Sequence, residues 1–208
     1  MGVKKLFPLL FALAAALPIL AWQARDGGYG NNDAGFYLQE AQEGYFALKE
    51  LRLPQAIGVM HQRLRYKPIL HTNLGTLLLA ATGGDTRAAT KIYLMGFFLL
   101  LAACAFRLAS LYLSRGRAAL AALFVVWHPL VFFSSQTFHT ELPFVTAAFY
   151  ALFYFLSWWR QTGSPWPFFL AVTLAVLIRP AEGSLLLAPL VVAMLLRALM
   201  ERRLSWPE

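Results

Sequence analysis

One hydrophilic stretch decides the fold, and its two ends read R-D-G-G-Y-G-N-N-D-A-G-F-Y-L-Q-E-A-Q (residues 25–42) and R-L-R-Y-K-P-I-L-H-T-N-L-G (residues 63–75). It covers residues 23–87 and is the one long hydrophilic segment between apolar runs. Asp33 stands just before an amphipathic pattern, and Lys67 stands just before Pro68. The apolar pattern of the rest of the chain predicts membrane helices. We therefore expect this stretch to fold back on the outer ends of these helices and to carry half of an active site.

The composition favours a membrane protein. Of 208 residues, 59% are hydrophobic and 13% are charged, whereas a soluble domain has about 45–50% apolar and about 25% charged residues. The net charge is +8, but the basic residues stand at the ends of apolar runs, which indicates topology and phosphate attraction and not nucleic-acid binding. Cys104 is the single cysteine, which excludes an intramolecular disulfide.

The apolar runs predict an all-α, polytopic helix bundle of about six spans. Residues 6–22 follow two lysines and fit either a cleaved signal peptide or a first span; the length of the run and Trp22 favour the span. Each further run reaches or approaches the ~20 residues that a spanning helix needs. These runs cover residues 88–110, 117–137, 140–159, 165–180 and 183–199.

The hydrophilic stretch itself predicts two helices. Residues 34–53 place apolar side chains on one face with a helical period and acidic side chains elsewhere. Glu40 is expected to lie outside the predicted apolar face. That face holds Tyr37, Ala41, Tyr45, Leu48 and Leu51. Residues 69–82 are apolar but too short to span, so we expect an interfacial or re-entrant helix that leans on the protein.

Short-loop charges predict that the N terminus and the C terminus are cytoplasmic in a plasma (inner) membrane. With that orientation the cytoplasmic segments hold Lys4, Lys5, Arg115, Arg117, Arg160, Arg202 and Arg203. The outer face would then collect Asp33, Lys67, His139, Glu141, Arg179 and Glu182. An ionisable group close to the hydrocarbon core is a functional candidate by default.

Each of these residues also has a purely structural interpretation. Arg179 and Glu182 could form an ion pair across one helical turn. Glu141 could cap the fourth span, since carboxylates favour helix N-termini, and Asp33 could cap the helix that follows it. Lys67 could be one more solvated charge. His71 and His139 are more often structural than catalytic, and no histidine spacing indicates a metal site.

Several motifs occur in the order of a known family. They are N-D-A-G-F-Y (32–37), Y-K-P-I-L-H (66–71), A-A-L-F-V-V-W-H-P-L-V-F-F-S-S-Q-T-F-H-T-E-L-P (121–143) and L-A-V-L-I-R-P-A-E-G-S-L-L-L (174–187). This order resembles the GT-C superfamily of membrane glycosyltransferases, and within it the branch of protein O-mannosyltransferases, aminoarabinose transferases and dolichyl-phosphate-mannose-protein mannosyltransferase-like proteins. The resemblance covers nearly the whole chain as one module, residues 1–208, and implies that the C-terminal part of the usual architecture is missing.

The resemblance implies a role for each candidate residue. Asp33 corresponds to the catalytic carboxylate, and Glu141 to a second acidic residue that orients the acceptor or binds a divalent cation. Lys67 and Arg179 would face the donor phosphate, with His71, His139 and Glu182 in support. The implied partners are a polyprenyl-phosphate sugar and a lipid, glycan or protein acceptor. One departure is that Asp33 is followed by Ala34, where family members often carry a second acidic residue.

Two other classes of function stay open from the sequence. A transporter or lipid flippase would also place charges inside a helix bundle, although no inverted repeat is visible. The chain could also be an inactive or truncated partner subunit, which is the third possible function. The chemistry favours transfer, because a carboxylate can deprotonate an acceptor hydroxyl and fixed cations can hold a leaving phosphate.

Overall fold

The computed structural model describes residues 3–25, 32–52, 54, 69–134, 138–160 and 162–204. Every regular element in these ranges is a helix, which confirms the all-α expectation. The helices are α1 (Val3–Arg25), α2 (Asn32–Lys49), α4 (Ile69–Ala81), α5 (Thr86–Ser110), α6 (Arg115–Val126), α7 (Pro129–Ser134), α8 (Glu141–Trp159), α9 (Trp166–Ile178) and α10 (Pro180–Leu204).

Four segments within these helices are long and apolar enough to cross a membrane: Leu6–Ala24, Thr86–Ser110, Glu141–Trp159 and Pro180–Arg197. They are the parts of α1, α5, α8 and α10 that match four of the six expected spans. Between 17% and 44% of each apolar window is buried inside the protein. The remaining apolar surface is available to lipid, as expected for helices at the edge of a bundle.

The other two expected spans are shorter than a bilayer. Residues 117–137 were expected as one span, but α6 ends at Val126 and α7 begins at Pro129. The break follows from Pro129, which lacks a backbone N–H; the imidazole of His128 accepts a hydrogen bond from the Leu130 amide at this point. Helix α9 has 13 residues, about 20 Å at 1.5 Å per residue. The six-span count therefore stays a prediction.

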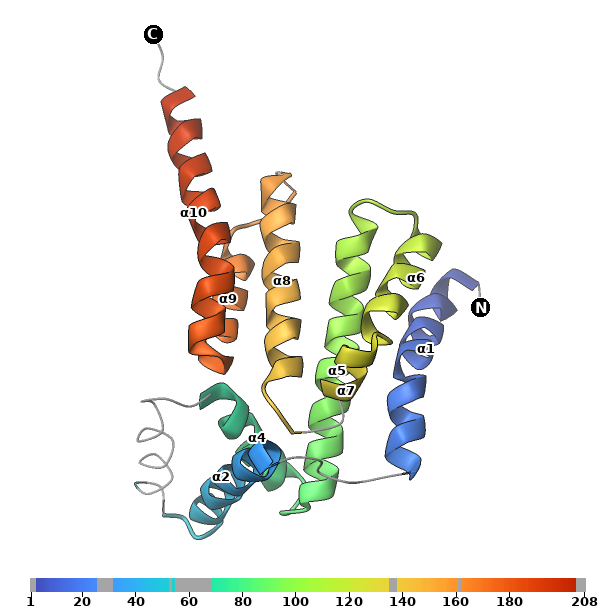
Figure 1. Ribbon diagram of the computed structural model, residues 1–208, viewed down its shortest axis with the longest axis vertical. Coiled ribbons are helices and arrows are strands. Elements are labelled where there is room, and N and C mark those ends of the chain that lie inside the picture. Colours follow the sequence, from blue (N-terminus) through green and yellow to red (C-terminus); the bar gives the residue numbers. More distant parts are fainter. Residues whose placement is uncertain are drawn as a thin grey trace.

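Figure 1 shows how the helices are arranged. α1, α5, α6, α8, α9 and α10 run roughly side by side, and α2 and α4 lie across one end of them. The turn between α9 and α10 faces this end, whereas the connection between α5 and α6 lies at the opposite end. Arg115 begins α6 and Arg160 directly follows α8. Both are thus separated along the bundle from Glu141, which begins α8, and from Arg179 in the α9–α10 turn.

The helices α2 and α4 pack closely on each other. The Thr76 hydroxyl donates to the Ala41 carbonyl at 3.1 Å. A Cβ on Gly75 would lie 3.0 Å from the Ala41 Cβ, and one on Gly44 would lie 2.6 Å from the Thr76 hydroxyl oxygen. Both glycines thus permit an approach that a larger side chain would prevent.

The predicted apolar face of α2 is partly wrong. Ala41 and Tyr45 are buried as expected, but Glu40 is also buried, at 5% exposure. The buried face is centred nearer Gly44, because α4 approaches where that side chain is absent. Leu51 is 80% exposed, since α2 ends at Lys49 and Leu51 has left-handed backbone geometry, with φ of 55°.

Two apolar clusters hold the long helices together. The first is built by α1, α5, α6 and α8 around Ile19, Phe98 and Leu142. The second is built by α8, α9 and α10 around Phe155, Phe168 and Met194. Helix α8 belongs to both, so its first residue, Glu141, is held in a fixed place relative to the α9–α10 turn.

Candidate functional site

The turn between α9 and α10 presents Arg179 at the end of the bundle. Arg179 has extended backbone geometry (φ −140°, ψ 90°) and ends α9, and Pro180 then begins α10. Proline suits the first position of a helix because its missing N–H would be unpaired there. A Cβ on Gly183 would lie 2.9 Å from the Val176 Cα, so glycine allows the two helices to meet this closely.

The Arg179 guanidinium lies between two carboxyl groups. Its Nη2 is 2.6 Å from Oε1 of Glu182, and its Nη1 is 3.6 Å from Oε1 of Glu141. The first contact is a charge-assisted hydrogen bond, and the second is longer than a hydrogen bond. The guanidinium carbon also lies 5.9 Å from the centre of the Phe144 ring. These contacts join the α9–α10 turn to the first turn of α8.

Glu141 is shared between Arg179 and a histidine. Its Oε2 contacts Nδ1 of His139, while Oε1 is the atom that faces Arg179. The His139 side chain is 13% exposed and that of Glu141 is 37% exposed. The four residues His139, Glu141, Arg179 and Glu182 therefore form one connected cluster, named here the charge cluster.

A chain of aromatic rings extends from the charge cluster into the protein. The Tyr37 ring, on α2, lies edge-on to both His139 and His71, with ring centres 5.6 Å and 5.1 Å away. The His71 Nδ1 lies 2.5 Å from the Tyr93 hydroxyl, which places α4 against α5. The Phe138 ring packs on His71, with 4.3 Å between ring centres. These contacts fix the segment that carries His139.

His71 acts as a buried neutral side chain in this chain of rings. Its exposed fraction is 0%. Its pKa is lowered from the ordinary 6.5 to about 3, mainly by burial and also by the nearby His139, while the Phe138 backbone acts in the opposite direction. An imidazole with this pKa is a poor general base near neutral pH. The structure thus favours a positioning role for His71.

Of the two candidates Asp33 and Lys67 from the hydrophilic stretch, the structure describes only the backbone of Asp33. Asp33 is the second residue of α2 and not the residue before it, so the helix starts slightly earlier than expected; its side chain lies outside what the structure describes. Tyr37, whose ring touches His139, is one helical turn further along α2. The backbone of Asp33 is thus about one turn from a ring that lines the cluster. Lys67 lies outside the described residues.

The structural alternatives from the sequence are also present. Arg179 and Glu182 form the ion pair across one turn. Glu141 is the first residue of α8, where a carboxylate is favoured by the helix dipole. Neither role accounts for the contact between Glu141 and Arg179, because the two residues come from different helices.

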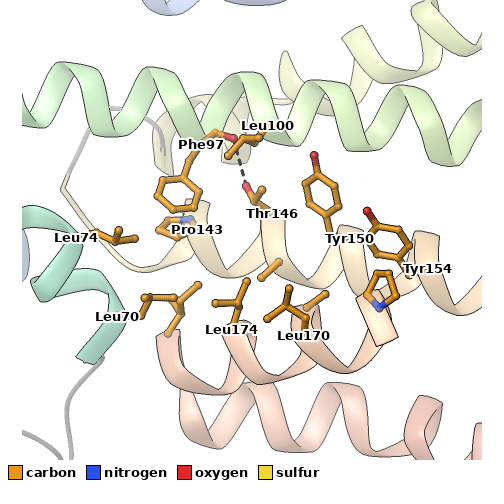
Figure 2. A pocket seen from close by; sticks show the side chains of 14 residues that line it. Leu70, Leu74, Phe97, Leu100, Pro143, Thr146, Tyr150, Tyr154, Leu170 and Leu174 are labelled. Carbon is orange, nitrogen blue, oxygen red and sulfur yellow. Dashed lines mark hydrogen bonds between the residues drawn. The ribbon is translucent and has the colours of Figure 1, made fainter. Parts of the chain in front are cut away.

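Figure 2 shows an apolar groove along the bundle. Its volume is about 420 Å³. It lies between α5, α8 and α9, and α4 closes one end with Leu70 and Leu74. At that end it is also lined by Pro143 and Ile178, which stand next to Phe144 and Arg179 in the chain. The Thr146 hydroxyl, 3.3 Å from the Phe97 carbonyl oxygen, donates across the groove wall.

Sequence reasoning missed the residues that support the cluster. Tyr37 was predicted to pack on an apolar face, but its contacts with two imidazoles depend on how α2 crosses α4. Tyr93 was treated as part of a span, and no local pattern distinguishes it. Within the described ranges, no group of three or more His, Cys, Asp or Glu residues has the geometry to hold a metal ion.

The comparisons with known proteins give no neighbour. No protein-family model matches the chain, no curated protein matches its sequence, and no solved structure matches its fold.

Proposed function

We propose that this protein transfers a sugar from a polyprenyl-phosphate donor to an acceptor hydroxyl at the outer face of the membrane. The observation that carries the proposal is the position of Arg179 in the chain: it directly follows Ile178, which lines an apolar groove. Glu141, which the Arg179 guanidinium approaches, stands two residues before Pro143 of the same lining. The proposal assigns the groove to the lipid chain of the donor and the Arg179 guanidinium to its phosphate head, because apolar side chains and a fixed guanidinium are complementary to these two parts.

The groove lining suits a polyprenyl chain. Apart from Thr146 and the hydroxyls of Tyr150 and Tyr154, its described lining is hydrocarbon or aromatic. Burying apolar surface there stabilises a bound chain by about 25 cal/mol per Å². The Arg179 contact that a phosphate oxygen would replace is the 3.6 Å approach to Glu141, because that contact is already too long for a hydrogen bond.

The charge cluster needs one more positive group to hold a phosphate. It contains one guanidinium and two carboxyl groups. The proposal assigns the additional charge to Lys67, which precedes α4 in the chain, with a divalent cation on Glu141 as the alternative. Chelation by EDTA distinguishes the two. If Lys67 supplies the charge, turnover continues in EDTA; if a divalent cation supplies it, turnover is lost.

The proposed reaction forms one bond to the sugar and breaks another. Asp33 accepts the proton of the acceptor hydroxyl, and the acceptor oxygen bonds to the anomeric carbon of the sugar. The bond from that carbon to the phosphate oxygen breaks, and the electron pair leaves with the polyprenyl phosphate. Arg179 and Lys67 stabilise the charge that develops on this phosphate. The proposal includes six membrane crossings, with α6–α7 as a broken crossing, and an orientation in which these groups lie at the outer face.

The test uses membranes that contain the protein and undecaprenyl-phosphate donors carrying labelled mannose, glucose or arabinose. The proposal expects release of free undecaprenyl phosphate and label in an acceptor. Leu174→Trp, which narrows the groove, should reduce turnover, whereas Leu195→Trp on the exposed side of α10 should not. Movement of intact donor between leaflets without release of phosphate would instead indicate a flippase.

A further inference from the structure

A second cavity lies at the opposite end of the bundle from the charge cluster. It has a volume of about 280 Å³ and lies between α1 and α5, with the first residue of α6 at its edge. Its apolar lining includes Phe7, Phe11, Ala103 and Phe106, and its charged lining consists of Arg107 and Arg115. The volume is close to the roughly 300 Å³ at which ligand pockets begin.

The apolar wall of this cavity is a group of three aromatic rings. Phe11 and Phe106 have ring centres 5.2 Å apart, and Phe7 lies 5.8 Å from Phe106. The Arg115 guanidinium carbon lies 4.0 Å from the centre of the Phe7 ring. This cation–π contact holds a positive charge over the apolar wall, at the place where the wall meets the end of the bundle.

The arginines of the cavity lack acidic neighbours. The chain has no Asp or Glu between Asp85 and Glu141, which includes all of α5 and α6. Among the described residues, no carboxylate lies within salt-bridge distance of Arg107 or Arg115. Arg117 adds a third exposed charge on the first turns of α6, which holds no acidic residue in its first turn.

Other arginines at this end are engaged within the protein. Arg160 donates to the Leu111 carbonyl at 2.7 Å and lies over the Tyr112 ring, at 4.2 Å from its centre. Arg197 donates to the Trp159 carbonyl. Arg107 and Arg115 differ from these two arginines, because their guanidinium groups border the cavity and, within the described ranges, donate to no backbone carbonyl.

We propose that this cavity binds one anionic phospholipid from the membrane leaflet at this end of the bundle. An acyl chain would lie against the three rings, and the lipid phosphate would lie between Arg107 and Arg115. Basic pockets between membrane helices bind anionic headgroups through this combination of charge and apolar contact. The site is separate from the groove and charge cluster of the proposed function and does not depend on it.

The experiment measures lipid binding to the purified protein by native mass spectrometry. The protein in detergent is titrated with phosphatidylglycerol or with phosphatidylcholine of the same acyl chains. The expected result is one phosphatidylglycerol bound at least about tenfold more tightly than phosphatidylcholine. Phosphatidylglycerol has a net negative charge whereas phosphatidylcholine is zwitterionic, and each basic residue near an anionic headgroup contributes roughly a fivefold preference. Equal affinity for both lipids would overturn the proposal.

Three sets of variants locate the site. Arg107→Gln with Arg115→Gln should abolish the preference, and Arg87→Gln, an exposed arginine at the other end of α5, should leave it unchanged. Arg107→Lys with Arg115→Lys keeps the charge and should keep the preference, which guards against a folding defect in the Gln pair. Ala103→Phe fills the cavity and should prevent binding with both arginines intact.

Two outcomes contradict the assignment directly. An equal loss for Arg87→Gln and for the Gln pair would mean diffuse charge attraction without a site. Displacement of bound phosphatidylglycerol by millimolar glycerol 3-phosphate would mean a soluble phosphate site, because the acyl chain would then contribute nothing. Failure of glycerol 3-phosphate to compete supports the lipid.

Discussion

Arg179 and Glu141 approach within 3.6 Å, although they belong to different helices. This approach joins the α9–α10 turn to the start of α8 and creates the charge cluster. Glu182 holds the other side of the guanidinium at 2.6 Å. The side chains of Arg179 and Glu182 are 29% and 45% exposed, so the cluster is open enough for a ligand phosphate to reach it.

The Arg179 guanidinium is predicted to bind the donor phosphate. Arg179→Ala should raise the KM for a polyprenyl-phosphate donor or lower kcat/KM by roughly 10- to 150-fold, because a charge-assisted contact contributes about 1.5–3 kcal/mol. Arg87→Ala removes an exposed arginine near the same end and should change neither value. Equal donor kinetics for the two variants would reduce Arg179 to an ion-pair partner of Glu182.

Membrane orientation is predicted by the short-loop charges. Reporter fusions after Gly116 and Gly163 should read cytoplasmic, and fusions after Gly58 and Gly84 should read external. Gly84 and Gly116 should read oppositely, because Gly84 precedes α5, Gly116 follows it, and α5 is long and apolar enough to cross the membrane. A cytoplasmic signal at Gly84 would place the charge cluster on the wrong face for the proposed donor.

The contact between α2 and α4 is predicted to tolerate no side chain at position 75. Gly75→Ala places a methyl group 3.0 Å from the Ala41 Cβ on α2 and 2.7 Å from the Phe138 ring, and overpacking of this kind costs about 1–3 kcal/mol. Thermal unfolding in detergent should show a lower Tm. Gly96→Ala is the control, since nothing lies within 4 Å of the added Cβ. A Tm for Gly75→Ala equal to that of the parent would show that α2 and α4 are not packed this closely.

Acid is predicted to loosen the packing around His71. Its pKa is lowered from 6.5 to about 3 by burial, so between these values the unfolded chain binds a proton that the folded chain does not. Stability from this group is complete above pH 6.5 and is lost as the pH falls towards 3. The Tm should therefore fall across this window.

His71→Phe should remove much of that pH dependence. The single variant should also be less stable at pH 7.5 by about 1–3 kcal/mol, because the buried Tyr93 hydroxyl loses its partner. Tyr93→Phe in the same chain should restore most of this loss. An unchanged slope of Tm against pH in His71→Phe would assign the acid sensitivity to other groups.

The sequence predicts local elements better than contacts between them. The short apolar run of residues 69–82 predicts α4, and the Arg-Pro step predicts the α9–α10 turn, because run length and proline chemistry act within a few residues. The break at Trp127 and His128 is not predicted, since membrane helices often tolerate proline. The burial of Glu40 and the contact of His71 with Tyr93 require the crossing of α2, α4 and α5, which no local pattern encodes.

The most direct measurement compares Asp33→Asn with Asp85→Asn in donor turnover. Asp85 caps α5 by accepting from the Ala88 amide at 3.0 Å, and asparagine caps about as well as aspartate. Both variants should fold and insert like the parent protein. The account predicts that Asp33→Asn lowers release of undecaprenyl phosphate by about 10²- to 10⁴-fold, the usual contribution of a general base, while Asp85→Asn retains full turnover. Full turnover by a normally inserted Asp33→Asn, or no turnover of any donor by the parent protein, would contradict it.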